Sequence, residues 1–123
     1  MKKHIEMRLA DGATLVDIKA DVMHTAINTA LVACYGNQTK ASALLSIHRQ
    51  VMRNWLNYET VGTYKRFEEV SLCVGKYTVK EMFTEAYIEA IGQVMSSNNN
   101  NVTMTAKILG CQRNTVAKYM VKP

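Results

Sequence analysis

Apolar residues recur at helical spacing along two long segments of the chain, and the two segments begin 64 residues apart. In each segment they form two adjoining stripes, as expected of a helix that packs on two neighbours. Each segment opens with a threonine followed three residues later by an acid, a pattern in which the threonine caps the helix. The patterns predict long helices from Thr14 to about Cys34 and from Thr78 to about Ser96.

The two acids of these capping patterns differ in length. Glu81 is long enough to return the hydrogen bond to the Thr78 amide and complete a capping box. The shorter Asp17 is expected to favour its helix N-terminus mainly by charge.

Each predicted long helix is followed by a breaker and then by two short helices. The breakers are Tyr35-Gly36-Asn37 and the serine- and asparagine-rich stretch 96–101, residue types that tolerate the left-handed conformation. The short helices are predicted over 39–45 and 49–58, and over 103–109 and 113–121, with turns at 46–48 and 110–112. Two short helices joined by a tight turn are typical of a helix-turn-helix.

An offset of 64 residues aligns residues 14–58 with 78–122 without a gap, which indicates an internal duplication. Cys111 occupies the position of Ile47, so we interpret it as an apolar residue and not as a nucleophile. The identical pairs are Thr14/Thr78, Ala26/Ala90, Ile27/Ile91, Asn37/Asn101, Thr39/Thr103, Leu45/Leu109 and Arg49/Arg113.

The duplication also predicts which side chains form the core. In each copy the expected buried residues come from the long helix and from the inner faces of the two short helices. They are Ile27, Leu31, Leu44, Leu45 and Met52 in the first copy and Ile91, Met95, Ile108, Leu109 and Val116 in the second.

Charge separates two surfaces from the rest of the chain. The 123 residues carry 15 Lys and Arg against 10 Asp and Glu, a net charge of +5. Segments 37–58 and 101–123 hold three and four of the basic residues and no acid, which favours a polyanionic partner for both.

Several other classes of protein find no support in the composition. No apolar run is long enough for a membrane span, and the N-terminus lacks the apolar core of a signal peptide, so we expect a cytoplasmic protein. The three cysteines and three histidines show no metal-ligand spacing, so neither a metal nor a cofactor is expected. The chain has no phosphate-binding loop and no catalytic triad pattern, so we expect no enzyme.

The first acid-free segment resembles a known DNA-binding family. The stretch Asn37-Gln-Thr-Lys-Ala-Ser-Ala-Leu-Leu-Ser-Ile-His-Arg-Gln-Val-Met-Arg-Asn-Trp-Leu56 is similar to the DNA-binding end of the factor for inversion stimulation (Fis), a pattern shared by the C-terminal domains of NtrC-type activators. The stretch 101–120 keeps the asparagine, the glycine turn and the Arg-x-Thr start in a looser form. Ser46 and Trp55 depart from the pattern, because the family has glycine and a basic residue there.

The resemblance implies an all-α fold of tandem, duplicated Fis-like helix-turn-helix units with long pairing helices. It divides the chain into a first unit (1–58), a partly helical connecting segment (59–77) and a second unit (78–123). Fis-like proteins carry one unit per chain and dimerise. This chain carries two, which are expected to pair either within one chain or between chains.

The resemblance also implies a helix upstream of each long helix. Tyr64, Phe67, Val70 and Val74 recur at helical spacing before Gly75, and Met1, Ile5 and Leu9 precede Asp11-Gly12. A hairpin through Asp11-Gly12 is the alternative for the first of these segments, because Ile5, Met7 and Leu9 also alternate.

Candidate DNA contacts follow from the outward positions of the short helices and from the residues that match the family. Arg49 and Arg113 match its base-contacting arginine, while the asparagines and threonines that open the preceding helices either hold phosphate, cap the helix, or do both. The candidates are Asn37, Thr39, Lys40, His48, Arg49, Gln50, Arg53, Asn101, Thr103, Lys107, Gln112, Arg113, Asn114, Thr115 and Lys118.

These observations predict a sequence-specific protein that binds double-stranded DNA and regulates transcription or shapes DNA in a bacterium or a phage-infected host. The first unit is expected to set sequence preference and the second to add affinity that is largely sequence-blind, because Ala117 replaces Arg53. The alternative is an adaptor or inhibitor that reuses the scaffold to hold a protein such as a polymerase or recombinase. Trp55 bears on this choice: it packs against Leu44 or a neighbouring helix, or it forms a partner patch.

Overall fold

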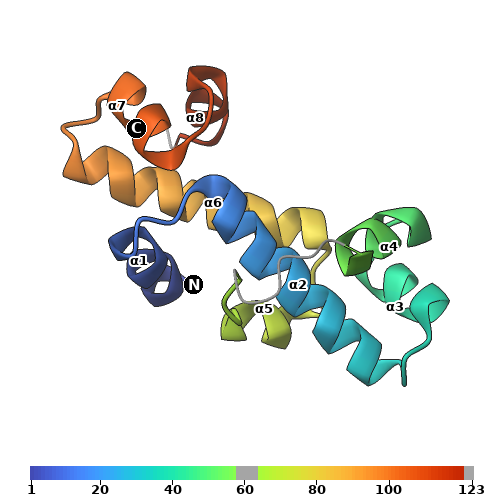
Figure 1. Ribbon diagram of the computed structural model, residues 1–123. Coiled ribbons are helices and arrows are strands. Elements are labelled where there is room, and N and C mark those ends of the chain that lie inside the picture. Colours follow the sequence, from blue (N-terminus) through green and yellow to red (C-terminus); the bar gives the residue numbers. More distant parts are fainter. Residues whose placement is uncertain (58–63, 121–123) are drawn as a thin grey trace. The chain divides into compact units, whose positions relative to one another are not determined.

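The computed structural model describes residues 1–57 and 64–120, and the described chain is all-helical (Figure 1). The predicted fold class is therefore confirmed at the level of secondary structure. The parts of the predicted final helices at Tyr58 and Val121 lie outside the described residues. The helices are α1 (Lys2–Ala10), α2 (Leu15–Ala33), α3 (Gln38–Leu45), α4 (Arg49–Asn57), α5 (Glu68–Cys73), α6 (Val79–Ser97), α7 (Val102–Leu109) and α8 (Arg113–Tyr119).

The two long helices, α2 and α6, begin at capping boxes. The Thr78 amide donates to Glu81 Oε1 at 2.9 Å and the Glu81 amide donates to Thr78 Oγ1 at 3.1 Å. The bond to the Thr78 backbone lowers the pKa of the Glu81 carboxyl below its ordinary value. Asp17 also accepts from the Thr14 amide, at 2.9 Å, so the prediction that it acts mainly by charge is wrong. Threonine and aspartate approach closely enough at this helix start to close the same reciprocal pair.

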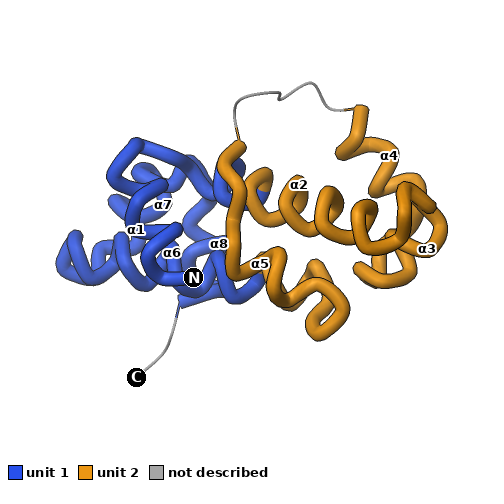
Figure 2. Tube along the Cα trace, turned by 90° about the horizontal axis from the view of Figure 1, so that it is seen from below, with its two compact units in different colours: residues 1–19, 84–123 blue, residues 20–83 orange. Residues whose placement is uncertain are grey.

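The chain forms two compact units, and each combines residues from both halves of the sequence (Figure 2). Unit 1 comprises residues 1–19 and 84–123, and unit 2 comprises residues 20–83. Each unit therefore holds a short stretch of one long helix and the greater part of the other. The pair α3–α4 belongs to unit 2, together with α5, whereas α7–α8 belongs to unit 1, together with α1.

Unit 1 is held together by contacts from α6 to α1 and to the C-terminal helices. Ile5 of α1 is fully buried, and Gln93 of α6 donates through Nε2 to the Lys2 carbonyl at 3.1 Å. The buried Thr105 of α7 donates through Oγ1 to Met95 Sδ at 3.2 Å. The second bond satisfies a hydroxyl group that burial would otherwise make costly.

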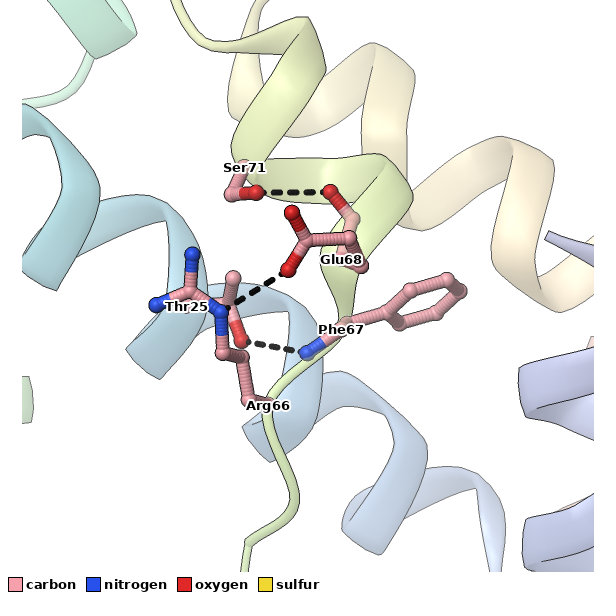
Figure 3. Close-up of polar contacts among 5 residues, drawn as sticks. All are labelled: Thr25, Arg66, Phe67, Glu68 and Ser71. Carbon is pink, nitrogen blue, oxygen red and sulfur yellow. Dashed lines mark hydrogen bonds and ion pairs between the residues drawn. The ribbon is translucent and has the colours of Figure 1, made fainter.

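Unit 2 is held together by polar side chains that α2 directs at the segment before α5. The buried Asp21 accepts through Oδ1 from the Lys65 amide at 2.8 Å, and the buried Thr25 accepts through Oγ1 from the Phe67 amide at 2.9 Å. Figure 3 shows the second of these bonds beside the exposed ion pair of Arg66 and Glu68. The Phe67 ring is fully buried, so the segment is fixed by both polar and apolar contacts.

The 64-residue offset found in the sequence reappears in the helix boundaries. The pairs α2/α6 and α3/α7 begin and end 64 residues apart. Asn37 and Asn101 cap α3 and α7 in the same way, and Ser46 and Gly110 follow these helices in the same left-handed conformation. Ala41/Thr105, Ser42/Ala106, Leu45/Leu109 and Met52/Val116 are all buried.

Three of the ten residues predicted to be buried are not. Leu44 is 37% exposed and Ile108 is 44% exposed, while Leu31 is half-buried. Leu44 and Ile108 each precede a leucine that is fully buried. Neighbouring residues on a helix point about 100° apart, so a residue beside a core position can still face solvent, as Leu44 and Ile108 do. The other seven predicted residues are buried.

The upstream segments are both helical but unequal. Residues 2–10 form α1, so the hairpin alternative through Asp11-Gly12 is wrong. The second upstream helix is shorter than predicted: the apolar spacing runs from Tyr64 to Val74, whereas α5 begins at Glu68 and ends at Cys73. Tyr64 lies in a bend before it, and Phe67 has an extended backbone whose amide donates to Thr25 on α2.

The turns after α3 and α7 provide a test of backbone strain. Ser46 adopts φ 58°, a conformation in which a Cβ is costly, whereas a Cβ on Gly110 (φ 67°) would lie 3.3 Å from Thr14 Cγ2. We expect Ser46→Gly to raise the free energy of unfolding by about 0.5–1 kcal/mol and Gly110→Ala to lower it by about 1–2 kcal/mol. Urea unfolding of the two variants measures both changes in the free energy of unfolding. If both variants changed it in the same direction, the left-handed conformation assigned to the two turns would be wrong.

Candidate nucleic-acid interface

The first candidate surface is the helical pair α3–α4, called here the first helical pair (residues 37–57). Asn37 accepts through Oδ1 from the Lys40 amide at 3.0 Å, which satisfies one of the unpaired amides at the start of α3. Asn37 is therefore a helix cap, one of the two roles that the sequence left open. Ser46, Ile47 and His48 then form the turn into α4, and His48 is exposed.

Helix α4 has one apolar side and one wide polar side. Met52 is fully buried and anchors the helix in unit 2. Arg49, Gln50, Arg53 and Asn54 are exposed and fall on one continuous arc of the helix, because residues four apart are neighbours on its surface. Gln50 donates through Nε2 to Asn54 Oδ1 at 3.0 Å across this arc.

The second candidate surface is the helical pair α7–α8, called here the second helical pair (residues 101–119). Asn101 accepts through Oδ1 from the Met104 amide at 3.0 Å and so caps α7 as Asn37 caps α3. Val116 is fully buried at the position of Met52. The outward arc of α8 carries Arg113, Asn114, Ala117 and Lys118, all exposed.

An aromatic contact ties each final helix to the long helix of its own unit. Trp55 of α4 is half-buried and meets the His24 ring of α2 edge-on at 5.4 Å between centroids. Tyr119, which occupies the same position in α8, meets Tyr87 of α6 edge-on at 5.3 Å. Contacts of this geometry add to the apolar burial that positions both helices. The prediction that Trp55 packs on a neighbouring helix is confirmed.

His24 joins these aromatic contacts to the segment before α5. Its ring stacks on Tyr64 at 4.5 Å between centroids, and the Tyr64 hydroxyl accepts from Asn28 Nδ2 at 3.0 Å. Burial lowers the pKa of His24, while the nearby Asp21 carboxylate raises it less strongly. His24 therefore packs between Trp55 and Tyr64, and its lowered pKa favours the neutral imidazole.

The structure distributes the fifteen predicted contact residues over the two helical pairs. Fourteen of them are exposed and Thr115 is half-buried. Lys40 and Lys107 do not correspond: Lys40 lies in the first turn of α3, whereas Lys107 lies in the last turn of α7. The two pairs thus place their lysines at opposite ends of otherwise matching helices.

Asn54 was not among the predicted contact residues. It lies on the same exposed arc as Arg53 and is hydrogen-bonded to Gln50, so it belongs to the outward surface of α4. The spacing of four residues between Gln50 and Asn54 would have identified it, because amide side chains so spaced on a helix bond to each other.

The electrostatic character of both surfaces is uniform. Neither segment 37–57 nor segment 101–119 contains an acidic residue, and Lys40, Arg49, Arg53, Arg113 and Lys118 are exposed. Lys118 Nζ lies 5.3 Å from the centre of the Tyr119 ring. This cation–π contact keeps the ammonium group close to the surface of α8. The exposed basic groups of each pair therefore have no acidic neighbour within the pair to neutralise them.

Three further features bear on metal binding, membrane insertion and thiol chemistry. Within residues 1–57 and 64–120, no three His, Cys, Asp or Glu side chains group as metal ligands, and no helix is long and apolar enough to span a membrane. Cys111 is half-buried, like Ile47, and its burial raises the pKa of the thiol, which disfavours the reactive thiolate.

Comparison with protein-family models, with curated proteins and with solved structures gives no match to this chain.

Proposed function

We propose that the chain is a sequence-specific protein that binds double-stranded DNA through two Fis-like helix-turn-helix units. It acts as a transcriptional regulator or architectural factor in the cytoplasm of a bacterium or of a phage-infected host. One observation carries the proposal: α4 and α8 present matching exposed arcs of polar and basic residues, and no acid lies in either helical pair. Surfaces of this composition suit a phosphate backbone and the base edges of a groove.

The division of roles within each pair follows from helix geometry. The capped N-termini of α3 and α7 present backbone amides, and the threonines at 39 and 103 lie exposed beside them, which suits contacts to phosphate. The arcs of α4 and α8 carry the arginines and amides that recognise guanine and adenine in the major groove. In such units the second helix enters the groove and the first crosses the backbone.

The duplication supports pairing within one chain. Each compact unit contains parts of both sequence repeats, so neither repeat supplies a complete unit by itself. The arrangement makes one chain equivalent to a dimer of single-unit proteins, with two non-identical helical pairs.

The adaptor alternative rests on Trp55 and on the looser match of the second unit to the family, and it loses the first of these. Trp55 was its candidate partner patch, but this side chain is half-buried against His24. The arcs themselves carry polar and basic side chains, which favour DNA over a protein partner.

The proposal is tested by the salt dependence of binding to a random-sequence duplex. A protein that neutralises several phosphates loses affinity steeply and linearly on a logarithmic scale as salt increases. Fluorescence anisotropy of a labelled duplex measures this slope, and an adaptor would show no such binding.

Single lysine variants of the full chain refine this test. We expect Lys40→Ala and Lys107→Ala each to weaken binding to all sequences alike and to reduce the salt slope by about 1. Lys3→Ala and Lys80→Ala serve as controls, because both lysines are exposed outside the helical pairs. Equal effects of all four substitutions would contradict the assignment of the surfaces.

A further inference from the structure

The arcs of α4 and α8 correspond position by position but are not identical. Arg49 and Arg113 agree, and Gln50 and Asn114 carry the same amide group. The next turn differs, because Arg53 and Asn54 of the first pair stand opposite Ala117 and Lys118 of the second. All these side chains are exposed, so the difference lies on the outward surface and not in the core.

The first difference changes which base the second turn of the helix can recognise. The planar guanidinium of Arg53 presents paired donors that match the O6 and N7 acceptors of guanine. The methyl group of Ala117 has no donor, but it can contact the C5-methyl of thymine. The two helices therefore favour different bases at corresponding positions.

The second difference concerns the amides. The 3.0 Å bond from Gln50 Nε2 to Asn54 Oδ1 orients both side chains and leaves Gln50 Oε1 as an acceptor and Asn54 Nδ2 as a donor. An acceptor and a donor side by side match the N6 amino group and N7 of adenine. Lys118 holds a point charge over the Tyr119 ring instead, which suits a phosphate better than a base edge.

Resting on the proposed binding of DNA, we infer that the two helical pairs recognise non-identical half-sites, so that the preferred DNA is not a palindrome. The first half-site has guanine at the base that faces Arg53 and adenine beside it. The second half-site has thymine at the base that faces Ala117 and carries less sequence information. A homodimer of single units would instead require two equal half-sites.

Selection of duplexes from a random pool by the full chain tests this inference. The wild-type protein should enrich sequences with two unlike half-sites. Arg53→Ala should reduce the preference for guanine in the first half-site by about 5- to 150-fold. Ala117→Arg should create a guanine preference of the same order in the second half-site, making the two halves more alike.

Ala117→Lys is the matched control, because it adds the same charge at the same place without the planar fork of arginine. It should raise affinity for every duplex and create a much weaker guanine preference than Ala117→Arg does. All three substitutions are at exposed positions, so the fold is preserved.

The outcomes separate this inference from the proposed function. Enrichment of equal half-sites, or base preferences that Arg53→Ala and Ala117→Arg leave unchanged, would overturn the inference while DNA binding stands. The same holds if Ala117→Lys creates the guanine preference as well as Ala117→Arg does. Absence of salt-sensitive binding to any duplex would overturn the proposed function itself, and the inference with it.

Discussion

Replacing Leu45 by alanine should lower the free energy of unfolding of unit 2 by about 2–5 kcal/mol. Leu45 is fully buried at the end of α3, and Ala41, Met52 and Ile27 are buried in the same unit. Truncation would leave a cavity among these buried side chains. The single tryptophan, Trp55, lies in this unit, so urea unfolding followed by its fluorescence reports the change directly.

Leu44 provides a matched control for this measurement. It neighbours Leu45 and has the same side chain, but it is 37% exposed, with its Cδ1 atom near Gly75. We expect Leu44→Ala to cost about 1–2 kcal/mol, less than Leu45→Ala. In unit 1, Leu109→Ala should likewise lower the free energy of unfolding more than Ile108→Ala does. Urea unfolding followed by circular dichroism measures this difference. If Leu44→Ala destabilised unit 2 as much as Leu45→Ala, the orientation of α3 would be wrong.

Replacing Arg49 or Arg113 by alanine should cost about 1–3 kcal/mol of binding free energy on a preferred DNA site and relax the preference at one base. Both arginines are exposed in the first turn of their helices, where recognition helices contact base edges. Affinity for random DNA should fall much less, because the lost contact is to a base and not to phosphate. Competition between specific and random duplexes measures the ratio.

Arg66 is the control for the arginine substitutions. It is exposed in unit 2, outside the helical pairs, and forms an ion pair with Glu68 at 3.0 Å. Arg66→Ala should therefore leave the ratio of specific to random binding unchanged. Wild-type binding by both Arg49→Ala and Arg113→Ala would show that α4 and α8 are not the recognition helices.

Local chemistry made much of this fold predictable from the sequence. Asn37 and Asn101 cap their helices as asparagine does elsewhere, and the threonines at 14 and 78 begin the long helices where their spacing to an acid indicates. These features depend on residues three or four apart, so a single sequence contains all the information they need. The same periodicity indicated most of the outward residues of α4 and α8, but it missed Asn54 and included the half-buried Thr115.

Features that depend on distant contacts were not predictable in this way. Nothing in the local pattern indicates that Asp21 and Thr25 bond to the backbone at residues 65 and 67, and these bonds accompany a shorter α5 than expected. Leu44 and Leu45 are equally apolar, and only the position of the neighbouring elements decides which of them is buried. The composition of each compact unit from both repeats is a tertiary property of the same kind.

The most direct test of the central claim is the change in backbone amide chemical shifts when an isotope-labelled full chain is titrated with duplex DNA. The account predicts that the shifts concentrate in residues 37–57 and 101–119, the two helical pairs, and that they recede as salt is raised. Shifts confined to α1 and α5, or no shifts at low salt, would contradict DNA binding through these surfaces.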